Sequence, residues 1–197
     1  MQKNLRISAL LLLFSLVAIS CKKDSSIDTA QSNTSTFKLS SIAVVNGLLL
    51  DAYKCEKKVN KIENSIPLAW SGSPANAKSF AITMIHYPNS SDLVNFNSYL
   101  ELWGIDKSVS EISYAKAGNG PWFMGPNKDL NAISYTSPCS SGSGTHQYTI
   151  TIYALSETPA SLPKENSMTV TNKVLMTALS KVTVIDKATL VFNSVTP

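Results

Sequence analysis

The sequence predicts a mainly β domain, a β-sandwich or a similar closed β architecture with few helices. Several stretches are apolar and rich in β-prone residues, turn-rich stretches separate them, and a single longer segment has a clear helical period. A sheet with an apolar face must bury that face against another layer, so many strands and few helices favour two packed sheets.

The first twenty residues have the pattern of an export signal. Lys3 and Arg6 precede an apolar run over 7–19, which has the length found in signal peptides. A run that crosses a bilayer needs about 20 apolar residues. We therefore expect residues 1–20 to be a signal peptide that is removed.

Cys21 comes directly after this run. The five residues before it, LVAIS, resemble a lipobox, the signal after which the cysteine thiol receives a diacylglyceryl group and the freed amine is acylated. The sequence thus predicts lipidation at Cys21 and a bacterial cell-envelope protein, anchored to a membrane on its periplasmic or surface side. The alternative is an ordinary secretory signal with a chance cysteine at the cut.

The chain after the cysteine divides into two parts. Residues 22–36 contain only two apolar side chains, Ile27 and Ala30, and therefore cannot form a core. We expect a flexible tether over 21–36 and one folded domain over 37–197, which is long enough for a sizeable core.

The charge of the chain is mildly basic, with a formal net charge of +4 and 15% charged residues. The densest group of lysines, Lys54, Lys57, Lys58 and Lys61, is best explained by a solvated loop. No nucleic-acid partner is expected.

Cys55 and Cys139 remain when Cys21 is assigned to the anchor. Export would place them in an oxidising compartment, which favours a disulfide between them. Closing a loop of about 85 residues would stabilise the domain by about 4 kcal/mol. Two buried free thiols are the alternative. The spacing of cysteines and histidines does not indicate zinc, so we expect no metal and no cofactor.

Four stretches are predicted as strands: residues 79–85, 99–105, 146–155 and 188–193. In the third, Tyr148, Ile150 and Ile152 share one face, and Thr149, Thr151 and Tyr153 share the other. Turn-rich stretches at 71–74, 118–121, 125–127 and 140–145 lie between the strands.

One helix is predicted near the C-terminus. Val174, Leu175, Ala178 and Leu179 recur at helical spacing, and Thr171 or Asn172 can cap its start. We interpret it as a helix that covers one face of a sheet. Residues 92–94 are a candidate for another short helical turn.

The segment 125–155 carries the strongest functional signal. Gly142 and Gly144 allow a tight turn whose bare N–H groups can approach a ligand. His146 opens the next strand and can donate a hydrogen bond to an anion. Alternatively, His146 is a strand-end residue that bonds a nearby carbonyl.

The same segment resembles the phosphatidylethanolamine-binding protein family, also known as the Raf kinase inhibitor-like proteins. The matching residues are Gly125, Asn127, Tyr135, Pro138, Cys139, Gly142, Gly144, His146, Tyr148 and the Tyr-Ala-Leu at 153–155. Upstream, residues 53–55, 66–74 and 78–81 match further family segments in the same order. An ordered set of this kind is far more specific than one glycine-and-histidine motif.

This resemblance implies a phosphatidylethanolamine-binding-protein-like β-sandwich with a few short peripheral helices. It also implies a small pocket for phosphate-like groups, among them a phospholipid head group. The ligand-binding residues we assign to the pocket are His146, Tyr148, Pro138, His86, Tyr99 and Tyr135.

Two positions depart from the family pattern. The family has Asp-Pro-Asp where this chain has residues 85–89, IHYPN, so His86, Tyr87 or Asn89 takes the place of an aspartate. A second family histidine corresponds to Tyr99. The pocket is therefore expected to keep His146 and to lose negative charge.

The sequence is compatible with three classes of function. The first is a membrane-anchored, non-enzymatic module that binds a small anion or a phospholipid head group. The second is an inhibitor or regulator of an envelope protease that acts through protein contacts.

The third class is an enzyme, suggested by Ser143 between Gly142 and Gly144. The nucleophile-elbow motif is absent, and no acidic residue is placed to orient His146, so we expect no enzymatic activity. Trp103, Trp122 and Phe123 are either a sugar-stacking platform or, more simply, core packing.

Overall fold

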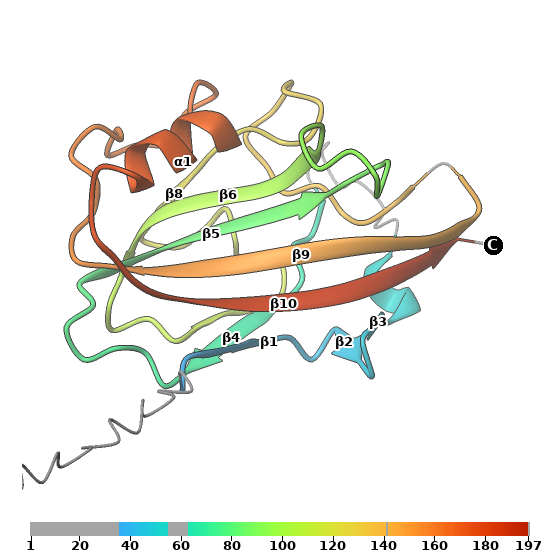
Figure 1. Cartoon of the computed structure of the whole chain (residues 1–197), viewed down its shortest axis with the longest axis horizontal. Coiled ribbons are helices and arrows are strands. Elements are labelled where there is room, and N and C mark those ends of the chain that lie inside the picture. The colour runs from blue at the N-terminus through green and yellow to red at the C-terminus, as the bar shows by residue number, and fades with distance from the viewer. Residues whose placement is uncertain (1–35, 55–62, 141, 197) are drawn as a thin grey trace, which may run out of the picture. The chain divides into compact units, whose positions relative to one another are not determined.

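The computed structural model describes residues 36–54, 63–140 and 142–196, all in the unit that begins at Thr34 (Figure 1). The expected signal peptide, Cys21, Cys55 and most of the expected tether lie outside these residues, as do Lys57, Lys58 and Lys61. Predictions about them therefore stay predictions.

The described residues form two sheets. The large sheet has the strand order β2-β3-β10-β9-β5-β6-β8, and the small sheet has the order β1-β4-β7. The strands of the large sheet are β2 (Val44–Val45), β3 (Leu48–Leu49), β5 (Ser79–His86), β6 (Asn97–Asp106), β8 (Phe123–Met124), β9 (Gly144–Leu155) and β10 (Val184–Thr196). The small sheet contains β1 (Lys38–Ser40), β4 (Leu68–Ser71) and β7 (Glu111–Ile112). One α-helix, α1 (Asn172–Leu179), and one 3-10 turn, η1 (Asp51–Tyr53), complete the described elements.

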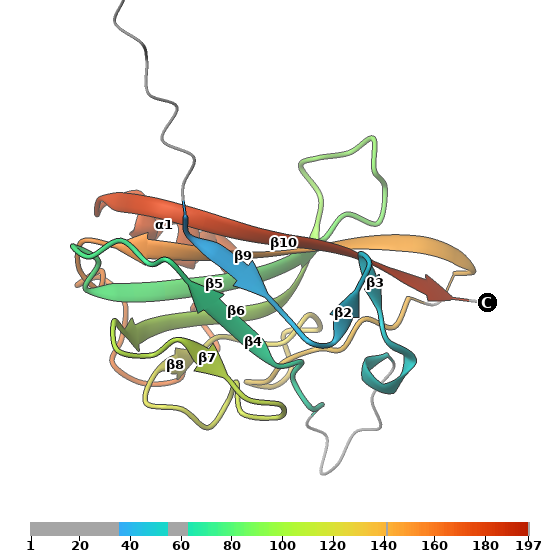
Figure 2. The ribbon, with the colours of Figure 1, turned by 90° about the horizontal axis from the view of Figure 1, so that it is seen from below.

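The main core lies between the two sheets. Figure 2 shows β1 and β4 crossing one face of the large sheet, with α1 on the far side. Phe80, Ile82 and Ile150 from the large sheet are buried in one cluster with Leu68 and Trp70 from the small sheet. The predicted mainly β sandwich is therefore confirmed.

A second, smaller cluster covers the opposite face of β5 and β6. Leu175, Ala178 and Leu179 of α1 pack there with Ala81 and Trp103. Because β5 is covered on both faces, nearly all of its residues are buried, as expected for a central strand. The predicted sheet-covering helix is confirmed in position and start.

Two details of the helix predictions are wrong. Val174 is exposed, since α1 turns only Leu175, Ala178 and Leu179 toward the sheet. Residues 92–94 form no helical turn, because the Asp92 carboxylate accepts hydrogen bonds from the backbone N–H groups of Val94 and Asn95 and closes a side-chain turn instead.

The predicted strands all exist, and all four are longer than expected. β10 runs to Thr196, and β5 ends at His86. In β9, Tyr148, Ile150 and Ile152 are buried and the alternate residues are partly exposed, as the sequence pattern predicts.

The register of the three central strands aligns three rings. His86 lies opposite Tyr148, and Tyr148 lies opposite Phe192. The His86 and Tyr148 ring centroids are 4.7 Å apart, and the Tyr148 and Phe192 centroids are 5.6 Å apart, with nearly parallel planes in both pairs. Stacked cross-strand pairs of this kind stabilise a sheet and fix its register. We call these three residues the ring row.

β6 contains two extra residues relative to β5. Phe80 pairs with Ile105 but Ile82 pairs with Leu102, and Met84 pairs with Leu100 but Ile85 pairs with Ser98. Such bulges redirect side chains. The first accommodates Gly104, whose φ is +70°, and the second accommodates Tyr99.

The bulge at Gly104 should tolerate no side chain. Its positive φ disfavours any L residue, and an added Cβ would lie 3.1 Å from a ring carbon of Phe123. We expect Gly104→Ala to lower the free energy of unfolding by about 1–3 kcal/mol, measured by urea denaturation.

Gly118→Ala is the matched control, because its Cβ would only make an ordinary contact, 3.6 Å from the Met124 sulfur. We expect the control to change stability by less than about 0.5 kcal/mol. Equal losses in the two variants would contradict this account of the bulge.

Candidate functional site

A cavity of about 230 Å³ lies where β5 ends and β9 begins. We call it the histidine cavity. It is lined by His86, Pro88, Asn97, Tyr99, Lys128, Cys139, Ser140, Gly142 and His146.

Backbone register brings its ring side chains together. His86 is the last residue of β5, and His146 lies two residues before its partner Tyr148, so both histidines face the same side of the sheet. Their ring centroids are 5.6 Å apart. Tyr99 reaches this side because the second bulge of β6 turns it inward beside Leu100.

Each histidine is held by a backbone carbonyl. His86 Nδ1 lies 2.8 Å from the oxygen of Gln147, and His146 Nε2 lies 2.9 Å from the oxygen of Gly142. Because a carbonyl oxygen only accepts, each of these nitrogens carries the proton and donates. The second nitrogens, His86 Nε2 and His146 Nδ1, are then the proton acceptors of the neutral rings.

Tyr148 forms the layer beneath the histidine cavity. It is fully buried, stacks on His86 and packs edge-on against Tyr99, with ring centroids 5.2 Å apart. Its hydroxyl lies 3.2 Å from that of Ser140, which lines the cavity. Tyr148 thus connects the hydrophobic core to the cavity wall.

The polar groups of the cavity favour an anion. None of its described lining residues is acidic, and Lys128 contributes a cation that pairs with Asp129 at the edge. Burial, with a smaller contribution from Tyr148, raises the pKa of Tyr99, so its hydroxyl stays protonated and able to donate. Hydrogen-bond donors and one positively charged side chain around a small hollow are the features of an anion-binding site.

The structure brings some of the predicted pocket residues together in the histidine cavity and places others elsewhere. His86, Tyr99 and His146 line the histidine cavity, and Tyr148 lies directly beneath it. Pro138 is buried and does not line it, and Tyr135 lines a different cavity with Glu63. Of the three residues that sequence reasoning left open, His86 is the one that lines the cavity.

Some lining residues escaped the sequence analysis. Lys128 directly follows Asn127 of the family motif, and Asn97 lies opposite His86 in β6. Cys139 also lines the cavity and is in a disulfide. Since Cys55 lies outside the described residues, the pairing of these two cysteines stays a prediction.

The aromatic residues weighed as a sugar platform belong to the core instead. Trp103 is fully buried, and its indole N–H donates to the carbonyl of Pro163. Its ring packs against Phe123. A buried ring cannot stack on a sugar, so the simpler interpretation is confirmed for Trp103.

A second cavity, of about 250 Å³, adjoins the first, and we call it the Glu101 cavity. It shares Asn97 and Lys128 with the histidine cavity and is also lined by Phe96, Leu130 and Asn172. Ser98 donates to one carboxyl oxygen of Glu101, and the other oxygen has no hydrogen-bond partner among the described residues. Burial raises the pKa of this carboxyl to about 8, although the side chain of Asn172 partly offsets the shift.

Among the described residues, no group of three histidine, cysteine or acidic side chains lies close enough together to hold a metal ion. No helix in this part of the chain is long and apolar enough to span a membrane.

Comparisons with known proteins agree on one family. The family model described as phosphatidylethanolamine-binding protein matches residues 40–194. A search of curated protein sequences finds no significant match.

Two solved structures share the fold. One is described as a phosphatidylethanolamine-binding protein homologue from Chlamydia trachomatis, with 21% identity and a TM-score of 0.66 over 83% of this chain and 99% of that one. The other is YbcL of E. coli, described as a new member of the mammalian family, with 19% identity and a TM-score of 0.63 over 82% and 99%.

The buried carboxyl predicts a pH dependence of stability. In the unfolded chain Glu101 ionises above its ordinary pKa of 4.5, whereas in the folded protein it holds its proton up to about pH 8. The folded state therefore loses stability as pH rises through this window, by roughly 2–4 kcal/mol. Urea unfolding at pH 5 and pH 8 measures the loss.

Glu101→Gln isolates this effect, because the amide keeps the shape and cannot ionise. The variant should lack the part of the pH dependence that comes from Glu101 and should be more stable than the wild type at pH 8. The same slope in both proteins would show that Glu101 ionises normally in the folded state.

Proposed function

The chain belongs to the phosphatidylethanolamine-binding protein family, and from this membership we propose that its histidine cavity binds a small anion, such as a phosphate or a phospholipid head group. In this proposal the domain is a non-enzymatic binding module. It is held to a bacterial envelope membrane by lipid on Cys21.

The convergence of two histidines and Lys128 on one hollow carries the proposal. The carbonyls of Gln147 and Gly142 fix both rings. The ammonium group of Lys128 and the protonated hydroxyl of Tyr99 are donors that an anion in this hollow would meet. Hydrogen bonds from charged donors are roughly twice as strong as neutral ones, so such a site favours an oxyanion.

The geometry of His146 supports a binding role over a hydrolytic one. A general base of the serine-hydrolase kind is oriented by a carboxylate, which also stabilises the ring once it is charged. Here the orienting group is the Gly142 carbonyl. The membrane attachment is supported by the export signal and Cys21 in the sequence.

Loss of His146 should remove anion binding. The described core lies within residues 36–196, so the test uses the chain from residue 22 onward, without the expected lipid. Sulfate is titrated while NMR follows the ring signals of the two histidines. We expect saturable shifts in the wild type, and at least tenfold weaker binding in His146→Ala and in Lys128→Ala.

Lys164→Ala is the control for charge, since Lys164 is exposed and does not line the cavity. No saturable shift at millimolar sulfate would refute the anion site. Inhibition of an envelope protease that persists in His146→Ala would then favour the regulator alternative.

A further inference from the structure

The segment that joins β5 to β6, residues 87–96, has an apolar tip. We call it the rim loop. Leu93 and Val94 at this tip are 70% and 81% exposed, among the most exposed large apolar side chains in the described residues. Figure 2 shows the rim loop projecting away from the strands that it connects.

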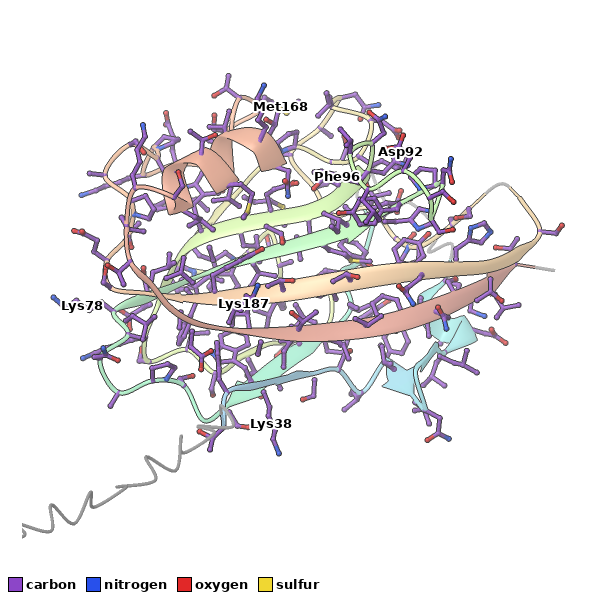
Figure 3. The ribbon with its side chains drawn as sticks, in the orientation of Figure 1. Lys38, Lys78, Asp92, Phe96, Met168 and Lys187 are labelled. Atoms are coloured by element: carbon purple, nitrogen blue, oxygen red, sulfur yellow. The ribbon has the colours of Figure 1, made fainter. Side chains whose placement is uncertain are left out.

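Internal hydrogen bonds order the rim loop. Asp92 accepts from the backbone N–H groups of Val94 and Asn95 and from the Asn95 amide, at 3.0, 3.1 and 2.6 Å. At the base, the rings of Tyr87 and Phe96 pack edge-on with centroids 5.8 Å apart. Asp92 and Phe96 of this loop are labelled in Figure 3. Leu93 and Val94 are thus presented to solvent by a preformed turn.

The rim loop is continuous with both cavities. His86 and Asn97, which flank it, line the histidine cavity together with Pro88 of the loop itself. Phe96 lines the Glu101 cavity, as does Leu130, which is 62% exposed. The loop that carries the exposed Leu93 and Val94 is therefore joined at both ends to residues that line the anion-favouring hollow.

This arrangement matches the chemistry of a phospholipid in a bilayer. Such a lipid joins an anionic phosphate directly to apolar chains, so a protein that binds the phosphate in place must meet the apolar layer beside it. The carboxylates nearby are compensated: Asp129 pairs with Lys128, and Asp92 is bonded by its own loop. A soluble anion would not need an apolar rim, and exposed apolar side chains in a group signal a contact surface.

We propose that the rim loop inserts Leu93 and Val94 into the interface of a phospholipid bilayer while the head group of one lipid occupies the histidine cavity. This inference rests on the proposed anion site and adds a direct contact between the rim loop and the membrane surface. The tether 21–36 is compatible with such contact, since about 15 residues reach up to about 50 Å from the anchor when extended.

The test measures binding to vesicles of phosphatidylethanolamine and phosphatidylglycerol in a three-to-one mixture. The chain from residue 22 onward is used, so that no lipid anchor masks the contact. We expect the wild type to sediment with vesicles, and the double variant Leu93→Asp, Val94→Asp to bind them at least tenfold more weakly. Ile42→Asp is the matched control, because Ile42 is 77% exposed and lies outside the rim loop. It should bind vesicles like the wild type.

Sulfate titration separates this inference from the proposed function. The double variant should keep wild-type sulfate affinity, which also shows that it is folded. Sulfate binding without any vesicle binding in the wild type would overturn the membrane contact and leave the anion site standing. Failure of both ligands would overturn both proposals.

A second readout locates the inserted residue. Val94→Trp should be quenched by lipids brominated on their acyl chains, and Ile42→Trp should not. Equal quenching at the two positions, or vesicle binding that survives the double variant, would overturn the assignment of the rim loop. Binding of the loop to an envelope protein in the absence of vesicle binding would overturn it as well.

Discussion

The ring row of His86, Tyr148 and Phe192 is the contact on which the described site depends. It ties three neighbouring strands together at one register, through stacked rings at directly paired positions. Because side chains alternate along a strand, a slip of one residue would turn the cavity side chains to the opposite face. The same stacking therefore stabilises the sheet and orients the histidines, and the core extends into the site through Tyr148.

The bulges of β6 add what regular pairing cannot supply. Regular alternation would place Tyr99 and Leu100 on opposite faces, yet both contribute to the core between the sheets. The extra residue at Tyr99 brings its ring against His86 and Tyr148. The other bulge requires glycine at position 104. Local departures from ideal strand geometry are often found next to functional sites, where they redirect a side chain.

The two cavities that meet at Asn97 and Lys128 differ in their electrostatics. One is lined by two histidines whose N–H groups donate to backbone carbonyls, and the other contains a carboxyl whose pKa burial raises to about 8. At neutral pH this carboxyl is mostly protonated, so it adds little negative charge beside the anion-favouring hollow. Phe96 of the rim loop and Leu130 line the second cavity, and Leu93 and Val94 at the tip of the same loop are exposed.

The sequence by itself determined the fold class, the longer strands, the sheet-covering helix and the family, because these follow from apolar periodicity and from ordered motifs around Pro138, Gly142 and His146. It also selected the three ring side chains of the cavity lining, His86, Tyr99 and His146. The tertiary structure decided that His86, and not Tyr87 or Asn89, lines the cavity. It also decided that Tyr135 lines another cavity and that Lys128 joins the site. These outcomes depend on cross-strand register, bulges and loop closure, which bring together residues tens of positions apart, and no local pattern encodes those distances.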